Sequence, residues 1–343
     1  MPPVALAGKD MKLSLLDQVQ IGTGRDSATA IADTVALSRH LDALGFVRHW
    51  IVEHHAVPYE ACVDPMVLAP ALAAATSRIR IGVGGVLLNN YSPYKVAESV
   101  QTLAALYPGR FDLGIGQSVS GPLPDLALQP DRSRALLHDQ GEKIHELLGH
   151  LFADLPAEHA FSSLKVMPDV APVRPWIMAV SPNSAARAGA LGLPLALSAF
   201  HKPEFAVESA ASYRRAFQAS GRQGLPQSPQ IFLAIRLSTG IDQEEAERLA
   251  MPMRWCFDQR RRLETMPDCL PTVDQAVALA GGVWPAETAE WPMYTICPLK
   301  DLRDRLRTMA QAVGCDEIML QDVLPDPAMR LAHYTAIAQV VAD

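Results

Sequence analysis

Residues 78–116 read RIRIGVGGVLLNNYSPYKVAESVQTLAALYPGRFDLGIG, and this stretch decides the fold. Its first part, Arg78–Val86, is rich in β-branched residues and glycine, which is typical of a buried strand. Ser92 then provides an N-cap before a proline at the first helical position, and apolar residues follow at helical spacing until a Pro-Gly pair. Phe111–Ile115 is a second strand. A strand, a helix and a strand in this order predict the βαβ unit of a parallel sheet.

The same alternation of short strands and longer helices runs along the rest of the chain. Six further strands are predicted, at Lys12–Leu16, His49–Val52, Pro175–Val180, Leu195–Ala199, Gln230–Leu237 and Glu317–Leu320. Eight parallel strands joined by helices close most simply into a barrel. No G-x-G-x-x-G motif follows the first strand, as a dinucleotide-binding fold would require. We therefore predict an α/β protein with a single (β/α)8 TIM barrel, as one domain over residues 1–343.

Residues from about 240 to 298 exceed what eight regular units need. They contain Gly281-Gly282, several prolines and interrupted helical patterns. The sequence therefore predicts an insertion after strand seven. No internal repeat or long linker divides the chain.

Composition excludes several classes of function. The net charge is −7 and no lysine- or arginine-rich block occurs, so a nucleic-acid partner is not expected. No apolar run is long enough for a membrane helix, and the first ten residues do not resemble a signal peptide. The five cysteines are scattered and form no C-x-x-C motif. Reduced thiols in a cytoplasmic protein are the simplest expectation.

The second predicted strand leads directly into Glu53-His54-His55. Strand alternation places His54 on the same face as Trp50 and its two neighbours on the other face. A histidine at a barrel mouth can act as a general base or donate a hydrogen bond to a reactive oxygen. A structural Glu-His pair that braces the barrel rim explains the same residues. A metal site is disfavoured, because adjacent histidines on one strand do not easily face one ion and no H-E-x-x-H motif occurs.

Two other strand ends carry candidate ligand-binding residues. Glycines at positions 82, 84 and 85 allow a close backbone approach to a flat ligand, or simply a bulge at a barrel corner. The fifth strand runs into Ser181-Pro182-Asn183-Ser184 at the start of a helix. Hydroxyls and free amides there suit a phosphate, although ordinary N-capping accounts for them on local grounds.

Together these segments resemble the bacterial luciferase-like flavin-dependent monooxygenase family, in order and along almost the whole chain. The matching segments are LSLLD (13–17), WIVEHH (50–55), AAATSRIRIGVGGVLLNNYSPYKVAE (73–98), LYPGRFDLGIG (106–116), PWIMAVSPNSAARAGALGLPLALS (175–198) and DEIMLQDV (316–323). The resemblance implies a flavin-binding (β/α)8 barrel. Most members of the family use reduced FMN and oxygen, and a sister branch uses a deazaflavin for hydride transfer.

The resemblance also implies roles for particular residues. His54 matches the histidine associated with catalysis beside the flavin, with Glu53 and His55 as its predicted catalytic neighbours. Val83 and Gly84 fall where the family often carries a non-prolyl cis peptide bond under the flavin ring. The predicted cofactor-binding residues are Val83, Gly84, Gly85, Gln117, Ser118, Ser181 and Ser184. No metal site is predicted.

Gln117 departs from the family pattern. The family usually has an arginine there as a phosphate partner, and a neutral amide cannot form a charged fork to phosphate. The departure predicts low FMN affinity, a reduced flavin that arrives as a diffusing co-substrate, or a different binding mode.

The predicted function is oxidation of a small organic substrate by a monooxygenase that uses reduced FMN and oxygen. A separate flavin reductase is the expected partner, because no NAD fingerprint is visible. The alternatives are a deazaflavin-dependent hydride-transfer oxidoreductase and a catalytically degenerate flavin-binding or partner protein. The family often dimerises through the helices after strands two and three, and the small residues APALAAAT (69–76) allow close helix contact. A homodimer is therefore expected.

Overall fold

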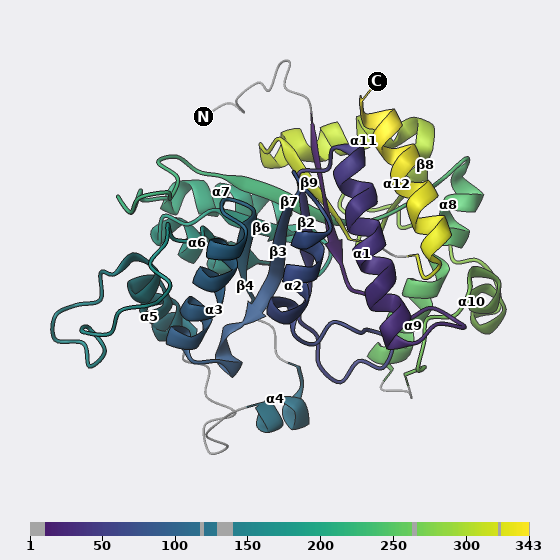
Figure 1. Ribbon diagram of the computed structural model, residues 1–343. Helices are drawn as coiled ribbons and strands as arrows, with labels where there is room; N and C mark the ends of the chain where they lie inside the picture. Colours follow the sequence, from purple (N-terminus) through teal and green to yellow (C-terminus); the bar gives the residue numbers. More distant parts are fainter. Residues whose placement is uncertain (1–10, 117–119, 129–139, 263–265, 322–323, 343) are drawn as a thin grey trace.

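The structure is a computed structural model that describes residues 11–116, 120–128, 140–262, 266–321 and 324–342 (Figure 1). Eight parallel strands form a barrel, and pairing of β1 with β9 and of β6 with β7 closes it. These strands are β1 (Lys12–Asp17), β2 (Arg48–Ile51), β3 (Arg80–Leu87), β4 (Phe111–Gly116), β5 (Pro175–Ala179), β6 (Leu195–Ser198), β7 (Ile231–Gly240) and β9 (Glu317–Gln321). The predicted (β/α)8 barrel is confirmed.

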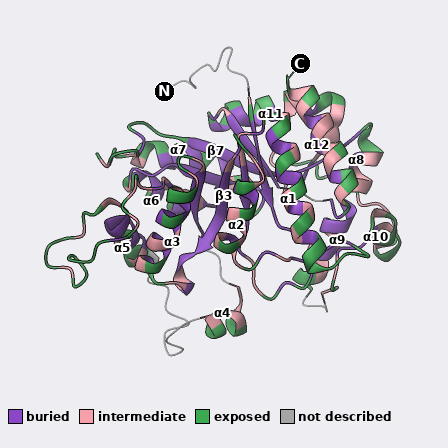
Figure 2. Ribbon diagram, in the orientation of Figure 1, coloured by how far each residue is buried: buried purple, intermediate pink, exposed green. Residues whose placement is uncertain are grey.

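Helices connect the strands and cover the outside of the barrel. The covering helices are α1 (Ser27–Leu44), α2 (Pro65–Ala74), α3 (Pro93–Leu106), α5 (Gln140–Phe152), α6 (Pro182–Ala190), α7 (Ala206–Ala216), α11 (Leu299–Val313) and α12 (Pro327–Ala342). The strands are buried, whereas the helices bury the faces that meet the strands and expose their outer faces (Figure 2). A large apolar layer, which includes Leu41 and Leu72, fills the space between strands and helices.

Two helix starts that the sequence predicts are confirmed. The Asp64 side chain accepts hydrogen bonds from the backbone N–H groups of Met66 and Val67, at 3.1 and 3.2 Å, and begins α2. The Ser92 hydroxyl accepts one from Lys95 N–H at 3.4 Å and begins α3. Each cap satisfies backbone donors that the first turn of a helix leaves without partners.

The centre of the barrel is filled by the indole of Trp50 on β2. Trp50 is completely buried, and its ring centroid lies 6.2 Å from that of Trp176 and 5.1 Å from that of Phe232, both edge-on. Glycine occupies the neighbouring positions on β3 and β4. A Cβ on Gly84 or Gly114 would lie 2.8 Å from an indole carbon, which is too close for two carbon atoms.

Buried ion pairs close the N-terminal end of the barrel, below Trp50. Asp112 on β4 binds Arg48 and Arg80, each at 2.5 Å, and Arg48 also binds Glu317 at 2.7 Å. The Trp50 indole N–H donates to Asp112 at 3.2 Å. Burial raises the pKa of Asp112, but the charges of Arg48 and Arg80 outweigh it and hold that pKa below its ordinary value. This end of the barrel is therefore a fully bonded plug, and the open end lies opposite.

The predicted insertion is confirmed, but it holds a strand that the sequence analysis missed. It contains α8 (Gln243–Leu249), α9 (Met251–Arg261), α10 (Val273–Ala280) and β8 (Thr295–Pro298). Strand β7 continues to Gly240, beyond the predicted end at Leu237, and pairs there with β8. The sequence analysis ended the seventh strand too early and missed β8. The reason is that β8 has only four residues and pairs with β7 outside the barrel.

The insertion is attached to the mouth of the barrel. Leu270 N–H donates to Ile21 O at 2.7 Å, and Thr23 N–H donates to Leu270 O at 3.0 Å. An apolar cluster that includes Tyr59 and Met253 joins the insertion to the loop after β2. The short helix α4 (Pro122–Leu128) lies at the same end, below the strands in Figure 1.

Within the described part of the chain, no helix combines the length and the apolar character that crossing a membrane requires. The five cysteines are free thiols.

Substitution of Gly82 by alanine tests the packing around Trp50. Gly82 lies opposite Trp50 in the β2–β3 register, and a Cβ there would overlap the indole ring. We expect Gly82→Ala to lower the free energy of unfolding by about 1–3 kcal/mol, as overpacking of a core does. Urea denaturation followed by tryptophan fluorescence measures it.

The matched control is Gly141→Ala near the start of α5, where no atom of the described residues lies within 4 Å of the added Cβ. We expect this substitution to leave the stability unchanged or to raise it by up to about 1 kcal/mol. Equal stability of the Gly82→Ala variant and the wild type would show that Trp50 does not constrain β3.

Candidate active site

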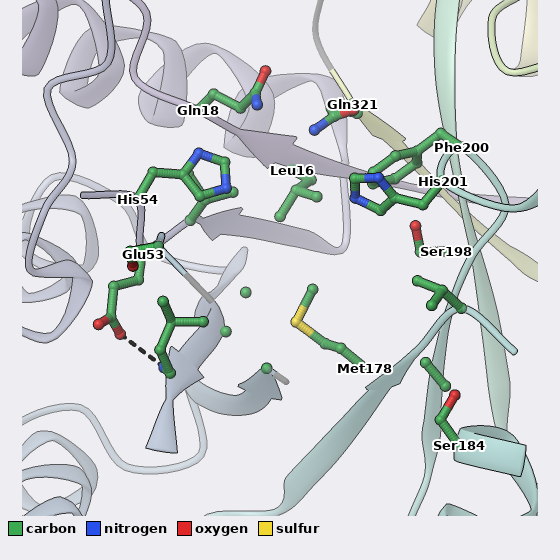
Figure 3. A pocket seen from close by; sticks show the side chains of 18 of the residues that line it. Leu16, Gln18, Glu53, His54, Met178, Ser184, Ser198, Phe200, His201 and Gln321 are labelled. Carbon is green, nitrogen blue, oxygen red and sulfur yellow. Dashed lines mark hydrogen bonds between the residues drawn. The ribbon is translucent and has the colours of Figure 1, made fainter. Parts of the chain in front are cut away.

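Side chains that point into the barrel at the C-terminal strand ends line a cavity of about 450 Å³. Strand alternation accounts for three of these side chains, because each of the three lies two residues after an inward-facing core residue. His54 follows Trp50 and Val52 just beyond the end of β2, Arg236 follows Ala234 on β7, and Gln321 follows Met319 on β9 in this way. Figure 3 shows His54 on one side of the cavity and Ser184 on the other.

His54 is held by a buried carboxylate. Its Nδ1 forms a short hydrogen bond with Glu60 Oε2, and the other Glu60 oxygen accepts from Gln18 Nε2 at 3.3 Å. The His54 side chain is 34% exposed, whereas that of Glu60 is 2% exposed. Since Nδ1 is engaged by Glu60, Nε2 is the nitrogen that His54 can offer to a molecule in the cavity. A carboxylate on one ring nitrogen orients the imidazole and sets which nitrogen carries the proton.

Glu53 and His55, the two neighbours of His54, brace the rim of the cavity. Glu53 is 1% exposed, and it accepts hydrogen bonds from Leu87 N–H, Tyr91 Oη and His55 Nε2, each at 2.9 Å. Burial raises the pKa of Glu53 above its ordinary value, although these three partners oppose the rise. The geometry therefore ties the end of β2 to the end of β3. A catalytic role for Glu53 and His55 stays a prediction.

The glycine-rich end of β3 contains a non-prolyl cis peptide bond. It joins Gly84 to Gly85, so the prediction that placed it between Val83 and Gly84 was wrong by one residue. Gly84 and Gly85 line the cavity, whereas Val83 is fully buried and faces the outer apolar layer. A Cβ on Gly85 would lie 2.7 Å from Gly114 O, so packing against β4 by itself requires glycine here.

The turn from β5 into α6 forms the opposite wall of the cavity. Ser181 and Ser184 form a capping box, in which each hydroxyl is bonded to the backbone N–H of the other at 3.4 and 3.2 Å. The start of α6 therefore meets the cavity, and Asn183 and Arg187 line it as well. A helix N-terminus with hydroxyls and a guanidinium is a donor set that fits a phosphate.

The residues present fit a flavin mononucleotide. The α6 donor set fits its phosphate. Gly84, Gly85 and Gly116 place no side chain in the cavity, so a flat ring can lie against that wall. Gln117 and Ser118, which the sequence also assigns to the cofactor, lie outside the described residues. Among the described residues, no group of three or more His, Cys, Asp or Glu side chains is arranged to hold a metal ion.

Sequence analysis missed four residues of the site. Arg187, His201 and Arg236 line the cavity, and Glu60 binds His54 from behind it. Glu60 lies in the loop after β2, and its buried contact with His54 leaves no spacing signal in the sequence. Arg187 lies three residues after Ser184, which is one helical turn, so the pattern S-x-x-R could have indicated it. Burial and the nearby charge of Arg236 lower the pKa of His201 to about 4.

The insertion closes part of the mouth. Phe257 and Arg260 on α9 line the cavity together with residues of the barrel strands. The shape of the cavity above the barrel therefore depends on the insertion as well as on the barrel strands.

Comparison with known proteins identifies the class of this chain. The family model described as luciferase-like monooxygenase matches residues 11–268. N-acetyl-S-alkylcysteine monooxygenase of Bacillus subtilis strain 168 is 36% identical over 241 residues, which is 69% of this chain and 70% of that protein. A luciferase-like monooxygenase of Escherichia coli strain K12 is 28% identical over 334 residues, 96% of each chain. The chain therefore belongs to the luciferase-like monooxygenase family, and it is an enzyme of that family.

Solved structures agree with the fold. The crystal structure of apo-MsnO8 superposes with a TM-score of 0.85 at 33% identity, over 97% of this chain and 98% of that one. A diketocamphane monooxygenase component from Pseudomonas putida in complex with FMN gives 0.69 at 18% identity, with 97% and 98% covered. An F420-dependent secondary alcohol dehydrogenase gives 0.66 at 16% identity, with 98% and 100% covered. The last two likenesses show the fold alone.

Glu53→Gln tests whether burial controls the ionisation of Glu53. Since the pKa of Glu53 is raised in the folded protein, folding favours its protonated form. That stabilisation is present below the unfolded pKa and is lost as pH rises through the folded pKa, by up to about 1.4 kcal/mol per pH unit. We expect the unfolding free energy of the wild type, relative to Glu53→Gln, to fall as pH rises above about 4, the ordinary pKa of a glutamate in an unfolded chain. Urea denaturation at each pH measures it.

The control variant is Tyr91→Phe, which removes one hydrogen bond to Glu53 and keeps the carboxyl group. We expect its stability relative to the wild type to be lower by about 1–2 kcal/mol and its pH dependence to be retained. A wild-type advantage over Glu53→Gln that stays constant or rises with pH contradicts a raised pKa.

Proposed function

We propose that this chain is a flavin-dependent monooxygenase that uses reduced FMN and O2 to oxidise a small organic substrate. One observation carries the proposal: His54, oriented by Glu60, faces the cavity whose other wall is the phosphate-fitting start of α6. Family membership supports the oxygenating chemistry, and the phosphate-fitting start of α6 supports a flavin nucleotide as the cofactor.

Reduced FMN would supply two electrons, and O2 would supply one oxygen atom to the substrate and one to water. The protein supplies position, proton transfer and exclusion of water. Glu60 keeps the proton of His54 on Nδ1, so Nε2 can accept a proton from a reacting oxygen and return it. The aromatic layer of Trp50 and Trp176 closes the bottom of the cavity, and α9 covers part of its mouth.

Arg187 takes the place of the arginine that the family usually has at position 117. It lines the cavity from α6, on the same wall as Ser181 and Ser184. We propose that these three residues hold the FMN phosphate. In this proposal Arg187 supplies the positive charge that Gln117 cannot supply, so the phosphate still has a cationic partner.

Turnover with an external reductase tests the function. We expect protein, FMN, NADH, a flavin reductase and isotopically labelled O2 to transfer one labelled oxygen atom to a thioether such as N-acetyl-S-methylcysteine, which N-acetyl-S-alkylcysteine monooxygenase suggests as a first substrate. Mass spectrometry detects the product. We expect His54→Gln to lower kcat by about 10²- to 10⁴-fold without a change in FMN affinity, because it removes only proton transfer.

The matched control is His159→Gln on the surface, which should leave kcat unchanged. If no substrate in a panel of thioethers, ketones and alkenes gains labelled oxygen, the monooxygenase proposal fails. Reduction of a substrate by a reduced deazaflavin, without O2, would instead favour the hydride-transfer alternative. Flavin binding without any turnover would favour a degenerate partner protein.

Flavin titration tests the role of Arg187. We expect Arg187→Gln to weaken FMN binding by about 10- to 100-fold, the effect of losing a charge-assisted hydrogen bond to phosphate. Riboflavin, which lacks the phosphate, should bind the wild type and the variant equally. Arg222→Gln is the control, because Arg222 pairs with Asp154 outside the cavity. An equal loss for riboflavin and FMN would assign Arg187 to folding rather than to phosphate binding.

The homodimer, the separate reductase and the cytoplasmic location stay predictions. The exposed side chains of Val63, Val67 and Leu106 near α2 and α3 support a subunit contact on that face. Light scattering in solution decides between one chain and two. We also propose that the insertion and the barrel act as one catalytic domain, because both line the cavity.

A further inference from the structure

Arg236 is a buried cation in the wall of the active-site cavity. Strand β7 turns Phe232, Ala234 and Arg236 inward in succession, so the guanidinium lies one layer above the apolar barrel core. The residue is 2% exposed. Neither the ion-pair plug at the opposite end of the barrel nor the His54–Glu60 pair involves it.

The guanidinium is only partly bonded. Its Nε donates to Gln321 Oε1 at 2.6 Å, and Nη1 donates to Phe200 O at 3.4 Å. Nη2 is buried, and among the described residues no acceptor meets hydrogen-bond geometry with it, although the nearby Tyr294 hydroxyl helps to hold the pKa of Arg236 up. The rings of Phe200, Phe257 and Tyr294 lie 4.8, 4.2 and 5.1 Å from the guanidinium carbon. Aromatic faces attract the cation, but they do not accept hydrogen bonds from the three remaining N–H groups as an anion would.

Two other arginines with little exposed surface have carboxylate partners. Arg330, 4% exposed, binds Asp17 at 2.8 Å, and Arg48 binds both Asp112 and Glu317. In the described part of the chain, Arg236 has no carboxylate within 4.0 Å. Burial lowers its pKa, although nearby Tyr294 and Glu60 oppose this. A buried charge without a counter-ion is costly, so its retention in a cavity wall indicates a ligand anion.

A second buried donor faces the same cavity. The hydroxyl of Ser198, at the end of β6, has no hydrogen-bond partner among the residues that the structure describes. His201, beyond it, is neutral near pH 7 because burial lowers its pKa to about 4. Arg260 adds a positive charge at the exposed mouth. This side of the cavity thus offers unpaired donors and net positive charge, with apolar rings around them.

We propose that Arg236 forms an anion subsite that binds the carboxylate of a small organic-acid substrate. The inference rests on the proposed function and specifies its substrate class. A carboxylate matches the site because one guanidinium nitrogen and one hydroxyl are unpaired, which is enough for two oxygens. The donors at the start of α6 suit a phosphate, and β6 separates that wall from β7. The flat aromatic rings select an apolar body on the acid.

Binding of phenylacetate and of phenylacetamide tests the subsite. The two molecules have the same shape, and only the first is charged. We expect the wild type to bind phenylacetate about 10- to 100-fold more tightly than the amide, in calorimetric titrations with and without FMN. Arg236→Gln should lose this preference while it keeps the wild-type affinity for FMN. Arg236→Lys keeps the charge without the planar fork, so it should retain a smaller preference.

Arg254→Gln is the matched control. Arg254 also lies against Tyr294, but its guanidinium donates to Trp284 O and Pro285 O and does not line the cavity. We expect this variant to keep the charge preference. If Arg236→Gln does not fold, the comparison of Arg236→Lys with Arg254→Gln decides the matter.

Three results would overturn the subsite. They are equal binding of acid and amide by the wild type, an unchanged preference in Arg236→Gln, and a loss of FMN affinity in Arg236→Gln, which would assign the guanidinium to the flavin. Failure of the monooxygenase proposal looks different. In that case the charge preference persists, and no oxygen is transferred to any substrate.

Discussion

The packing of Trp50 in the middle of the barrel is the constraint on which the rest of the structure depends. Its indole meets Trp176 and Phe232 edge-on, and its N–H donates to Asp112 in the ion-pair plug. A ring of this size fits a small barrel only where the neighbouring strands have no side chain. Glycines on β3 and β4 provide that space, so the strand that carries the cis peptide bond is also the strand that Trp50 requires to be glycine-rich.

The register of β2 transmits this constraint to the cavity. Trp50 faces inward, and Val52 and His54 continue this alternation beyond the end of β2, whereas Glu53 lies at the rim of the cavity and is bonded to the end of β3. If the register of β2 shifted by one residue, Glu53 would take the place of His54 in the cavity and His54 would take the place of Glu53 at the rim. The triplet Glu53-His54-His55 thus combines the two interpretations that the sequence left open, with Glu53 and His55 at the rim and His54 toward the cavity.

Sequence reasoning reached the features that depend on local patterns. Strand periodicity, the caps at Asp64 and Ser92 and the excess after β7 all follow from neighbouring residues, and the structure has each of them. Features that depend on contacts between residues distant in the sequence could not be predicted. Glu60 reads as an ordinary loop acid, and only the fold brings it to His54. Arg236 reads as one charge in a β-rich run, and a sequence cannot show that a buried charge lacks a counter-ion.

Charge placement separates the two ends of the barrel. At the N-terminal end, Arg48 and Arg80 share Asp112 and Arg48 also binds Glu317, so the charges there satisfy one another and contribute to a rigid plug. At the mouth, Glu60 is used to orient an imidazole, and Arg236 has aromatic rings in place of a carboxylate. An ordinary ion pair beside Arg236 would make the folded protein easier to stabilise, but it would neutralise the cavity. The plug shows that this chain can pair an arginine with a carboxylate, and in the described part of the chain Arg236 has no such partner. This difference distinguishes a binding surface from a structural one.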